Sequence, residues 1–301
     1  MKNNRQLLLA VLAGILLHTG IRAQTTVSYQ QEIEGWHAKR VQNLKAPNGW
    51  LNLVGLYWLE EGKNPFGSGR QNKVIFPAGT IVETAGIFER TGNTVKLVTL
   101  NNTAIKVNDK PIKEAVIFDK DSARQPVVSY GNLRWTIILR DDKIGVRLRN
   151  LESPQATTFK DIDRFPVDTA WRVSATLQTG GQARSIAITN ILGQTNQQQT
   201  PGKLVFTVNN QQYTLDALEE GDELFIIFGD ETSGKTTYPS GRFLYAQKPG
   251  ADGKTIIDFN KAYNPPCAFT NYATCPLPPK ENILPVAVTA GEKNYGHHTT
   301  E

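Results

Sequence analysis

The chain has 301 residues, of which 39% are hydrophobic and 20% charged, with a formal net charge of +5 at pH 7. This apolar content is enough for a hydrophobic core. Lys2, Arg5 and Arg22 lie in the N-terminal segment, and without that segment 30 basic residues face 28 acidic ones. Because nucleic-acid binding needs a basic stripe, we expect no nucleic-acid partner.

The first 23 residues have the pattern of a secretory signal peptide. Lys2 and Arg5 precede an apolar run, Leu7–Leu17, and a small residue, Ala23, follows it. A membrane-spanning helix needs about 20 apolar residues, and this run ends earlier, at His18. We therefore expect cleavage after Ala23, export to the periplasm or the cell exterior, and no membrane span in the mature protein.

Residues 24–301 are expected to form a single, mainly β domain that opens with one helix. Apolar residues spaced three and four apart predict an amphipathic helix over Gln30–Lys45, ended by Pro47 and Gly49. A turn is expected at Glu60–Asn64. The short runs that follow, separated by turn residues, are typical of an antiparallel barrel or sandwich. The expected strands are Lys73–Phe76, Thr80–Glu83, Gly86–Arg90, Thr94–Thr99, Ala104–Val107, Ala115–Asp119, Pro126–Ser129, Leu133–Leu139, Lys143–Leu148, Trp171–Thr179, Arg184–Asn190, Lys203–Val208, Gln212–Leu215, Glu223–Phe228, Gly241–Gln247, Thr255–Asp258 and Leu284–Thr289.

The stretch Phe259–Leu284 is predicted to be irregular because its prolines remove backbone donors. It contains the two cysteines of the chain, Cys267 and Cys275. A close pair in an exported protein indicates a disulfide, and a metal site would need further Cys or His ligands nearby. The tail after about residue 293 is expected to be disordered.

Beyond the predicted signal peptide, the sequence lacks the residue patterns that several kinds of catalysis and metal binding require. Beyond the signal segment the histidines are His37, on the predicted helix, and His297 and His298, in the tail. Catalysis by a Ser-His-Asp or Cys-His set needs an imidazole fixed beside a nucleophile. Paired aspartates such as Asp119 and Asp121 do not have the spacing of a calcium loop. We therefore expect no metal and no cofactor.

Two segments hold more unusual residues than folding requires. In the first, Asp230 follows a strand and Arg242 begins the next, so the two could form a bidentate ion pair. That pair would either close a loop or orient an anion.

The second segment runs from Asp258 through both cysteines to Asn282. It carries polar side chains bracketed by aromatic ones on irregular backbone, which is how β scaffolds often present a site. Alternatively, it closes one end of a barrel, with amide side chains satisfying backbone groups that no sheet pairs. Its polar and aromatic members are Asp258, Phe259, Asn260, Tyr263, Asn264, Phe269, Tyr272, Glu281 and Asn282.

The segments Gly49–Leu59, Thr237–Leu244 and Asp258–Pro279 carry motifs that resemble a bacterial family, catalogued as domain of unknown function 1684 (DUF1684). The chain is similar to that family over nearly all of its mature length, most specifically from Asn264-Pro265-Pro266-Cys267 to Cys275-Pro276-Leu277-Pro278-Pro279. Asn150 stands where the family pattern leads us to expect Asp. The resemblance implies one full-length domain and supplies no activity. The matching segments are Gly49–Leu53, Gly55–Leu59, Phe165–Asp168, Trp171–Val173, Thr237–Leu244, Asp258–Phe269, Tyr272–Pro279 and Ala290–Lys293.

Three functions are compatible with these residues. The favoured one is an exported β-barrel protein that binds a small ligand or glycan through Tyr238, Arg242, Asn260, Tyr263, Asn264 and Tyr272. The second is a histidine-free enzyme, similar to a glycan hydrolase, with carboxylates as acid and base. Its candidates are Asp230, Asp258, Glu281 and Glu292. The third is a purely structural protein of the cell envelope.

Overall fold

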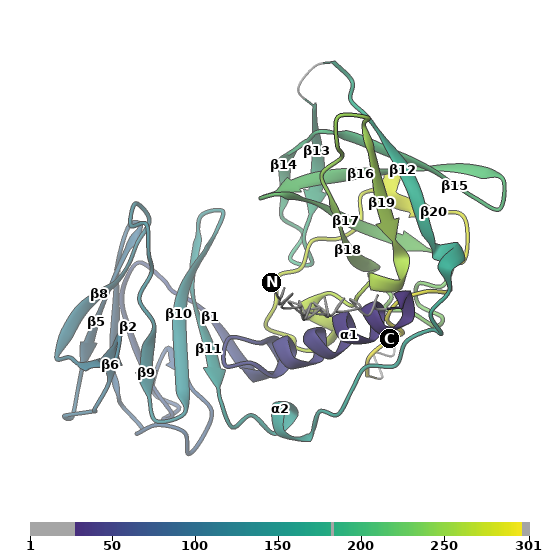
Figure 1. Ribbon diagram of the computed structural model, residues 1–301. Coiled ribbons are helices and arrows are strands. Elements are labelled where there is room, and N and C mark those ends of the chain that lie inside the picture. The colour runs from purple at the N-terminus through teal and green to yellow at the C-terminus, as the bar shows by residue number, and fades with distance from the viewer. Residues whose placement is uncertain (1–27, 182–183, 297–301) are drawn as a thin grey trace, which may run out of the picture.

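The computed structural model describes residues 28–181 and 184–296. The expected signal peptide, residues 1–23, lies outside the described residues, as do His297 and His298. Figure 1 shows a β sandwich on the left and a barrel-like sheet at the upper right, with helix α1 (Tyr29–Lys45) below the barrel and reaching toward the sandwich. Among the helices described, none is long and apolar enough to cross a membrane.

The sandwich packs two sheets around one hydrophobic cluster. One sheet has the order β1-β11-β10-β9-β6-β7 and the other β3-β2-β4-β5-β8. Phe66 stacks on Phe88 within its own sheet and meets Trp135 of the opposite sheet edge-on, with ring centroids 6.1 Å apart. The strands are β1 (Leu53–Trp58), β2 (Gly62–Gly67), β3 (Val74–Ile75), β4 (Gly86–Thr91), β5 (Thr94–Thr99), β6 (Lys106–Val107), β7 (Lys110–Pro111), β8 (Glu114–Asp119), β9 (Val128–Tyr130), β10 (Leu133–Arg140) and β11 (Lys143–Asn150).

The barrel-like sheet has the order β18-β17-β16-β15-β12-β19 and is nearly closed. The Thr255 hydroxyl of β19 donates to the Gln247 carbonyl of β18 at 2.7 Å, across the remaining gap. Phe259, Val288 and Ala290 from the irregular C-terminal part fill the interior with the strand residues. The strands are β12 (Arg172–Gln178), β15 (Gly202–Val208), β16 (Gln211–Glu220), β17 (Glu223–Asp230), β18 (Arg242–Gln247) and β19 (Lys254–Asp258), with β20 (Ile283–Leu284) beside β17 and a separate hairpin of β13 (Arg184–Thr189) and β14 (Thr195–Thr200).

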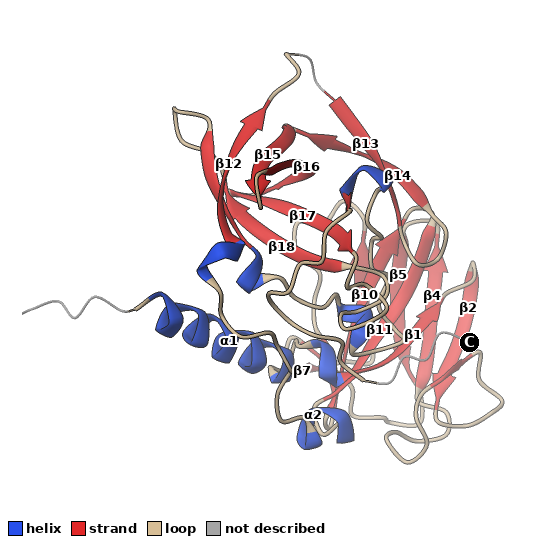
Figure 2. Ribbon diagram, turned by 90° about the vertical axis from the view of Figure 1, so that its right-hand side faces the viewer, coloured by secondary structure: helices blue, strands red, loops and turns tan. Residues whose placement is uncertain are grey.

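A third hydrophobic cluster lies outside both β structures. It joins Leu44 of α1 and Leu51 to the outer face of the barrel, at Leu218 and Phe243, and to the disulfide segment around Cys267. Figure 2 shows the helices beside the barrel and the sandwich. The remaining helices are α2 (Pro154–Thr158) and the 3₁₀ turns η1 (Trp50–Asn52), η2 (Thr169–Trp171), η3 (Phe259–Lys261), η4 (Pro266–Ala268) and η5 (Lys280–Asn282).

The expected fold class is confirmed: mainly β, with one N-terminal helix and an irregular C-terminal segment that contains a disulfide. Both a sandwich and a barrel-like sheet occur. The single domain over 24–301 stays a prediction. At the start of the tail, Tyr295 packs on Phe269 with ring centroids 4.8 Å apart.

Some expected strands are wrong. Thr80–Glu83 is a loop whose carbonyls accept from the backbone of Ser68 and Gly69. In Leu284–Thr289 only Leu284 is in a strand. The turn expected at Glu60–Asn64 is shorter, because β2 begins at Gly62 despite its Pro65. The all-polar strand β14 was not expected, because its side chains lack the branched and aromatic character of a strand.

Candidate functional site

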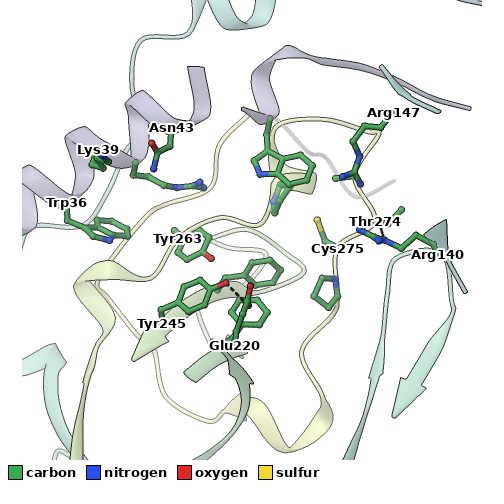
Figure 3. A pocket seen from close by; sticks show the side chains of 17 residues that line it. Trp36, Lys39, Asn43, Arg140, Arg147, Glu220, Tyr245, Tyr263, Thr274 and Cys275 are labelled. Carbon is green, nitrogen blue, oxygen red and sulfur yellow. Dashed lines mark hydrogen bonds between the residues drawn. The ribbon is translucent and has the colours of Figure 1, made fainter. Parts of the chain in front are cut away.

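A pocket of about 610 Å³ lies where α1, the barrel, the sandwich and the disulfide segment meet. From α1 come Trp36, Lys39, Arg40 and Asn43; from the outer face of the barrel Glu220, Phe225, Phe243 and Tyr245; from the sandwich Arg140 and Arg147; and from the connecting segments Trp50, Tyr263, Pro266 and Ala273–Pro276. Figure 3 shows the aromatic side chains Trp36, Tyr245 and Tyr263 on one side and Arg140 and Arg147 on the other. The lining therefore combines a cationic side with an aromatic one.

The disulfide segment forms one wall of the pocket. Cys267 and Cys275 are joined, with Cα atoms 6.1 Å apart, as expected from the sequence. The Cys275 carbonyl accepts from the backbone of Ile191, and Leu277 donates to Thr189, so the segment is tied to the β13–β14 hairpin. The wall is therefore held both covalently and by backbone hydrogen bonds.

Reduction of the disulfide is expected to lower the free energy of unfolding by about 2–3 kcal/mol, because the short loop between the cysteines gains chain entropy in the unfolded state. Urea unfolding with and without a reducing agent measures the difference. The control is Cys267→Ser with Cys275→Ser, whose unfolding should not respond to the reducing agent. Equal midpoints for the wild-type protein in both conditions would contradict this expectation.

Arg147 is the most unusual residue of the pocket. It lies in β11, its side chain is 9% exposed, and its Nε has no hydrogen-bond partner. Its guanidinium lies 5.3 Å from the centre of the Trp50 ring. Burial, together with the charges of Arg140 and Arg149, lowers the pKa of Arg147 to about 10. Within 28–181 and 184–296, no carboxylate forms an ion pair with it.

Two other cations beside the pocket also lack a carboxylate partner among the described residues. Arg140 Nε donates to the Thr274 hydroxyl at 3.2 Å, and Arg140 Nη1 donates to the Leu139 carbonyl. Lys39 is exposed on α1 and has no ion pair there. Both line the pocket with Arg147. Figure 3 shows Lys39 beside Trp36, across the pocket from Arg140 and Arg147. Positive charge on both sides of the pocket is therefore not paired with a carboxylate of the described residues.

Arg40 differs from these three cations, because the fold neutralises it. Its Nε lies 3.1 Å from Glu292 Oε1, and its Nη2 donates to the Asn264 carbonyl at 2.9 Å. The guanidinium also stacks on Tyr263, 4.6 Å from the ring centre. Arg40 thus holds α1 against the C-terminal part of the chain.

The aromatic side of the pocket carries hydroxyl groups that stay protonated. Tyr245 donates to Glu220 Oε2 at 2.8 Å, drawn as a dashed line in Figure 3. Tyr245 and Tyr263 lie nearly parallel, with centroids 6.4 Å apart. Burial raises the pKa of both hydroxyls, and for Tyr245 the bond to Glu220 adds to that effect. Both groups are therefore hydrogen-bond donors and acceptors across the physiological pH range.

Asp230 and Arg242 meet inside the barrel wall, not in the pocket. Arg242 Nη2 lies 2.9 Å from Asp230 Oδ2, and both side chains are fully buried. Arg242 also donates to the carbonyls of Val288 and Ala290. The expected ion pair is present, but only one guanidinium nitrogen contacts the carboxylate, so it is not bidentate.

Asp258 and Asn260 lie together at the beginning of α1. Asp258 Oδ1 accepts from the Tyr29 hydroxyl at 2.8 Å, and Asn260 Nδ2 donates to the same hydroxyl and to the Asp168 carbonyl. Both side chains are buried. Asp258 lines a second hollow, between α1 and the strands β18 and β19.

The other nominated residues are spread over the molecule. Glu292 is buried against Arg40, and its Oε2 accepts from the Asn264 backbone at 2.7 Å. Glu281 is exposed and lines a hollow on the β13 side. Tyr272 lines another hollow, beside Tyr295, and Tyr238 is buried in the third hydrophobic cluster. Of the binding and catalytic candidates nominated from the sequence, Tyr263 is the one that lines the main pocket.

The sequence reasoning missed the residues that give the pocket its charge. One signal was available in strand β11, where apolar residues alternate with arginines. Successive side chains of a strand point to opposite faces, so Arg147 and Arg149 lie on the outer face, opposite Ile144, Val146 and Leu148. An outer face is normally solvated. The segments that bury it, around Trp50 and Cys275, come from other parts of the chain.

Comparison with known proteins gives a family but no activity. The family model described as "Protein of unknown function (DUF1684)" matches residues 157–293, so the motif at Gly49–Leu59 lies outside the matched stretch. No curated protein matches the chain. A solution structure of an uncharacterized protein from Haloarcula marismortui is 31% identical, with a TM-score of 0.40, over 48% of this chain and 82% of that one.

FHA domains also match part of the chain. One, studied for phosphothreonine-dependent interactions, is 19% identical with a TM-score of 0.22, over 31% of this chain and 92% of that one. A second, the FhaA FHA domain in complex with an intracellular domain, has the same identity and TM-score and is covered over 97% of its length. With TM-scores this low, none of the structural likenesses supports a conclusion about fold or ligand. The matched family model shows that residues 157–293 of this chain belong to the DUF1684 family.

Proposed function

We propose that the pocket binds a small organic anion, with its carboxylate or phosphate group on Arg147 and its apolar part on the aromatic side. The observation that carries this proposal is the burial of Arg147 without a carboxylate partner. Buried charges in proteins are normally paired, because desolvating an unpaired ion is costly. A bound anion supplies the missing charge, and a guanidinium can hold it through two parallel hydrogen bonds.

The shape and the lining of the pocket support the same function. A volume of about 610 Å³ falls within the usual range for small-molecule sites. Lys39 and Arg140 add positive charge at the rim, and Trp36 and Tyr245 supply flat apolar surface. A neutral ligand would leave the three cations unmatched. Binding, rather than catalysis, is proposed because the pocket's own carboxylate, Glu220, is engaged by Tyr245.

Isothermal titration with glucuronate and glucose tests the proposal, because the two ligands differ in one carboxylate. Phosphate and benzoate extend the panel to other anions. At least one of the three anions is expected to bind, and glucose is expected to bind at least about tenfold more weakly than glucuronate if glucuronate is that anion. Arg147→Met should weaken anion binding about tenfold or more, since a hydrogen bond to a charged group contributes about 1.5–3 kcal/mol.

Arg134→Met is the matched control. Arg134 lies in the neighbouring strand β10 and donates to the carbonyls of Gly131 and Leu133, away from the pocket. This variant should bind the anions as the wild-type protein does. The proposal is wrong if none of the three anions binds, or if Arg147→Met binds them with unchanged affinity.

A further inference from the structure

A second hollow continues the pocket on the far side of the aromatic residues. It has a volume of about 520 Å³ and lies between the first turns of α1 and the strands β18 and β19. Trp36, Tyr245 and Tyr263 line both hollows and so form a ridge between them. The ring centroids of Trp36 and Tyr263 are 6.5 Å apart, and those of Tyr245 and Tyr263 are 6.4 Å apart. The ridge is thus a row of three adjoining aromatic rings.

The chemistry of the second hollow differs from that of the anion pocket. Its charges nearly balance: the lining holds the cations Arg172, Lys248, Lys254 and Lys261 and the carboxylates Glu32, Glu223 and Asp258. Lys261 lies 2.6 Å from Glu32, and Gln247 donates to Glu223 at 2.7 Å. A second anionic group would therefore gain less there than beside Arg147. Hydroxyl groups fit better, because they both donate and accept hydrogen bonds.

One buried acceptor in this hollow is unused. Asp258 is 6% exposed, and its Oδ2 has no hydrogen-bond partner, although Lys261 Nζ lies 4.0 Å away. Its other oxygen is occupied by Tyr29. A buried carboxylate oxygen without a donor is costly, and a ligand hydroxyl in the hollow would provide one.

From these observations we infer that the ligand is an acidic oligosaccharide that lies across the ridge; this inference rests on the proposed anion site. An acidic sugar places its carboxylate on Arg147. The apolar faces of its rings cover Trp36 and Tyr245, and the hydroxyls of the next sugar reach Asp258 and Gln247. A row of aromatic rings with polar groups on both sides suits this alternation of apolar face and hydroxyl edge.

Titration with ligands of different length and charge tests the inference. A hyaluronan tetrasaccharide, which contains glucuronate, is expected to bind at least about tenfold more tightly than glucuronate alone. A neutral chitin tetrasaccharide and a tetraglutamate peptide are expected to bind more weakly than the hyaluronan tetrasaccharide, because the first lacks the carboxylate and the second lacks the rings. Intrinsic fluorescence of Trp36 and Trp50 gives an independent signal.

Variants separate the hollow from the pocket. Gln247→Ala with Lys254→Ala changes only side chains that line the second hollow. It should reduce the affinity for the tetrasaccharide toward that for glucuronate and leave glucuronate binding unchanged. Trp36→Ala should lower the affinity for the tetrasaccharide, and Trp36→Phe should restore part of that affinity. Lys113→Ala, exposed on the sandwich, is the control and should change neither.

The outcomes distinguish the two proposals. If glucuronate binds but the tetrasaccharide binds no more tightly, or the double variant has no effect on it, the inference is wrong and the anion site stands. If tetraglutamate binds as tightly as the tetrasaccharide, the ligand is an acidic peptide and the inference is wrong. If neither glucuronate nor the tetrasaccharide binds, the inference is wrong, and the phosphate and benzoate titrations decide whether the anion site fails with it.

Discussion

Asp230→Ala is expected to lower the free energy of unfolding by about 3–5 kcal/mol, because it leaves a buried guanidinium without its counter-charge. Arg242 is 0% exposed and has no access to solvent. Burial lowers the pKa of Arg242, and the charge of Asp230 opposes that effect. The substitution also removes the acceptor for the Thr232 hydroxyl and for the Val288 backbone. Urea unfolding followed by circular dichroism measures the loss.

A double variant shows whether the loss comes from the unpaired charge. Asp230→Ala combined with Arg242→Met removes both charges, and apolar replacement of a whole buried pair is often tolerated. We expect the double variant to be more stable than Asp230→Ala alone, although the Val288 and Ala290 carbonyls lose their donor. A change below about 0.5 kcal/mol for Asp230→Ala would show that the pair does not support the barrel.

Arg147→Met is expected to have the opposite effect on stability while it weakens anion binding. In the folded protein without ligand, the pKa of Arg147 falls from 12.5 to about 10. When the pKa of a base is lower in the folded than in the unfolded protein, the charged form of that base destabilises the folded protein. At about 1.4 kcal/mol per pKa unit the cost is on the order of 3 kcal/mol. We expect the methionine variant to gain about 1–3 kcal/mol and several degrees in Tm, since Met also packs well on Trp50.

The effect of Arg147 on the free energy of unfolding depends on pH in a definite direction. Below pH 10 Arg147 is charged in both the folded and the unfolded protein, so the full cost is present. As the pH rises through about 10, Arg147 loses its proton in the folded protein before it does so in the unfolded protein. The free-energy cost of burying its charge then disappears. The stability difference between Arg147→Met and the wild-type protein should therefore be constant near neutral pH and narrow above pH 10. Arg147→Lys keeps a charge and serves as the control.

The two arginines are expected to have different roles: Arg242 supports the fold, and Arg147 binds the ligand. Arg242 contacts a carboxylate and several carbonyls, and its removal alone should destabilise the protein. Arg147 contacts the Trp50 ring and no carboxylate of the described residues, and its removal should stabilise the protein. An excess of a bound anion should raise the stability of the wild-type protein but not of Arg147→Met, because ligand binding to the folded state shifts the unfolding equilibrium. If Arg147→Met is instead less stable by more than about 1 kcal/mol, the arginine is structural.

The C-terminal segment closes the barrel and also lines the pocket. Asn282 donates to the carbonyls of Asp216 and Ile227 and accepts from the Asp216 backbone, so its amide satisfies groups where β16 and β17 diverge. Phe259 enters the barrel interior. These contacts are those of a segment that closes a barrel. The same segment also supplies Tyr263 and Cys275 to the pocket.

Local patterns were sufficient for much of the fold. The apolar spacing of Ile33 and Leu44 placed α1 within one residue of its observed start, and Ser28 caps it with a capping box. The disulfide followed from the presence of two close cysteines. The ion pair of Asp230 and Arg242 followed from their positions at the ends of adjacent strands.

The pocket could not be predicted in the same way. Its lining comes from segments far apart in the chain, such as Trp36, Arg147 and Tyr245, and no spacing rule brings them together. Arg147 also looks like an ordinary surface residue of an amphipathic strand. Its burial depends on Trp50 and the disulfide segment, and strand patterns do not reveal how separate structures pack.

The most direct test of the anion site is a crystal structure of the protein soaked with selenate, whose selenium is located by its anomalous signal. The expected result is a selenate with an oxygen within about 3 Å of the Arg147 guanidinium, and no selenate in crystals of Arg147→Met. An empty pocket at a concentration that fills other surface sites, or Arg147 turned toward a carboxylate of the protein, would contradict the proposed function.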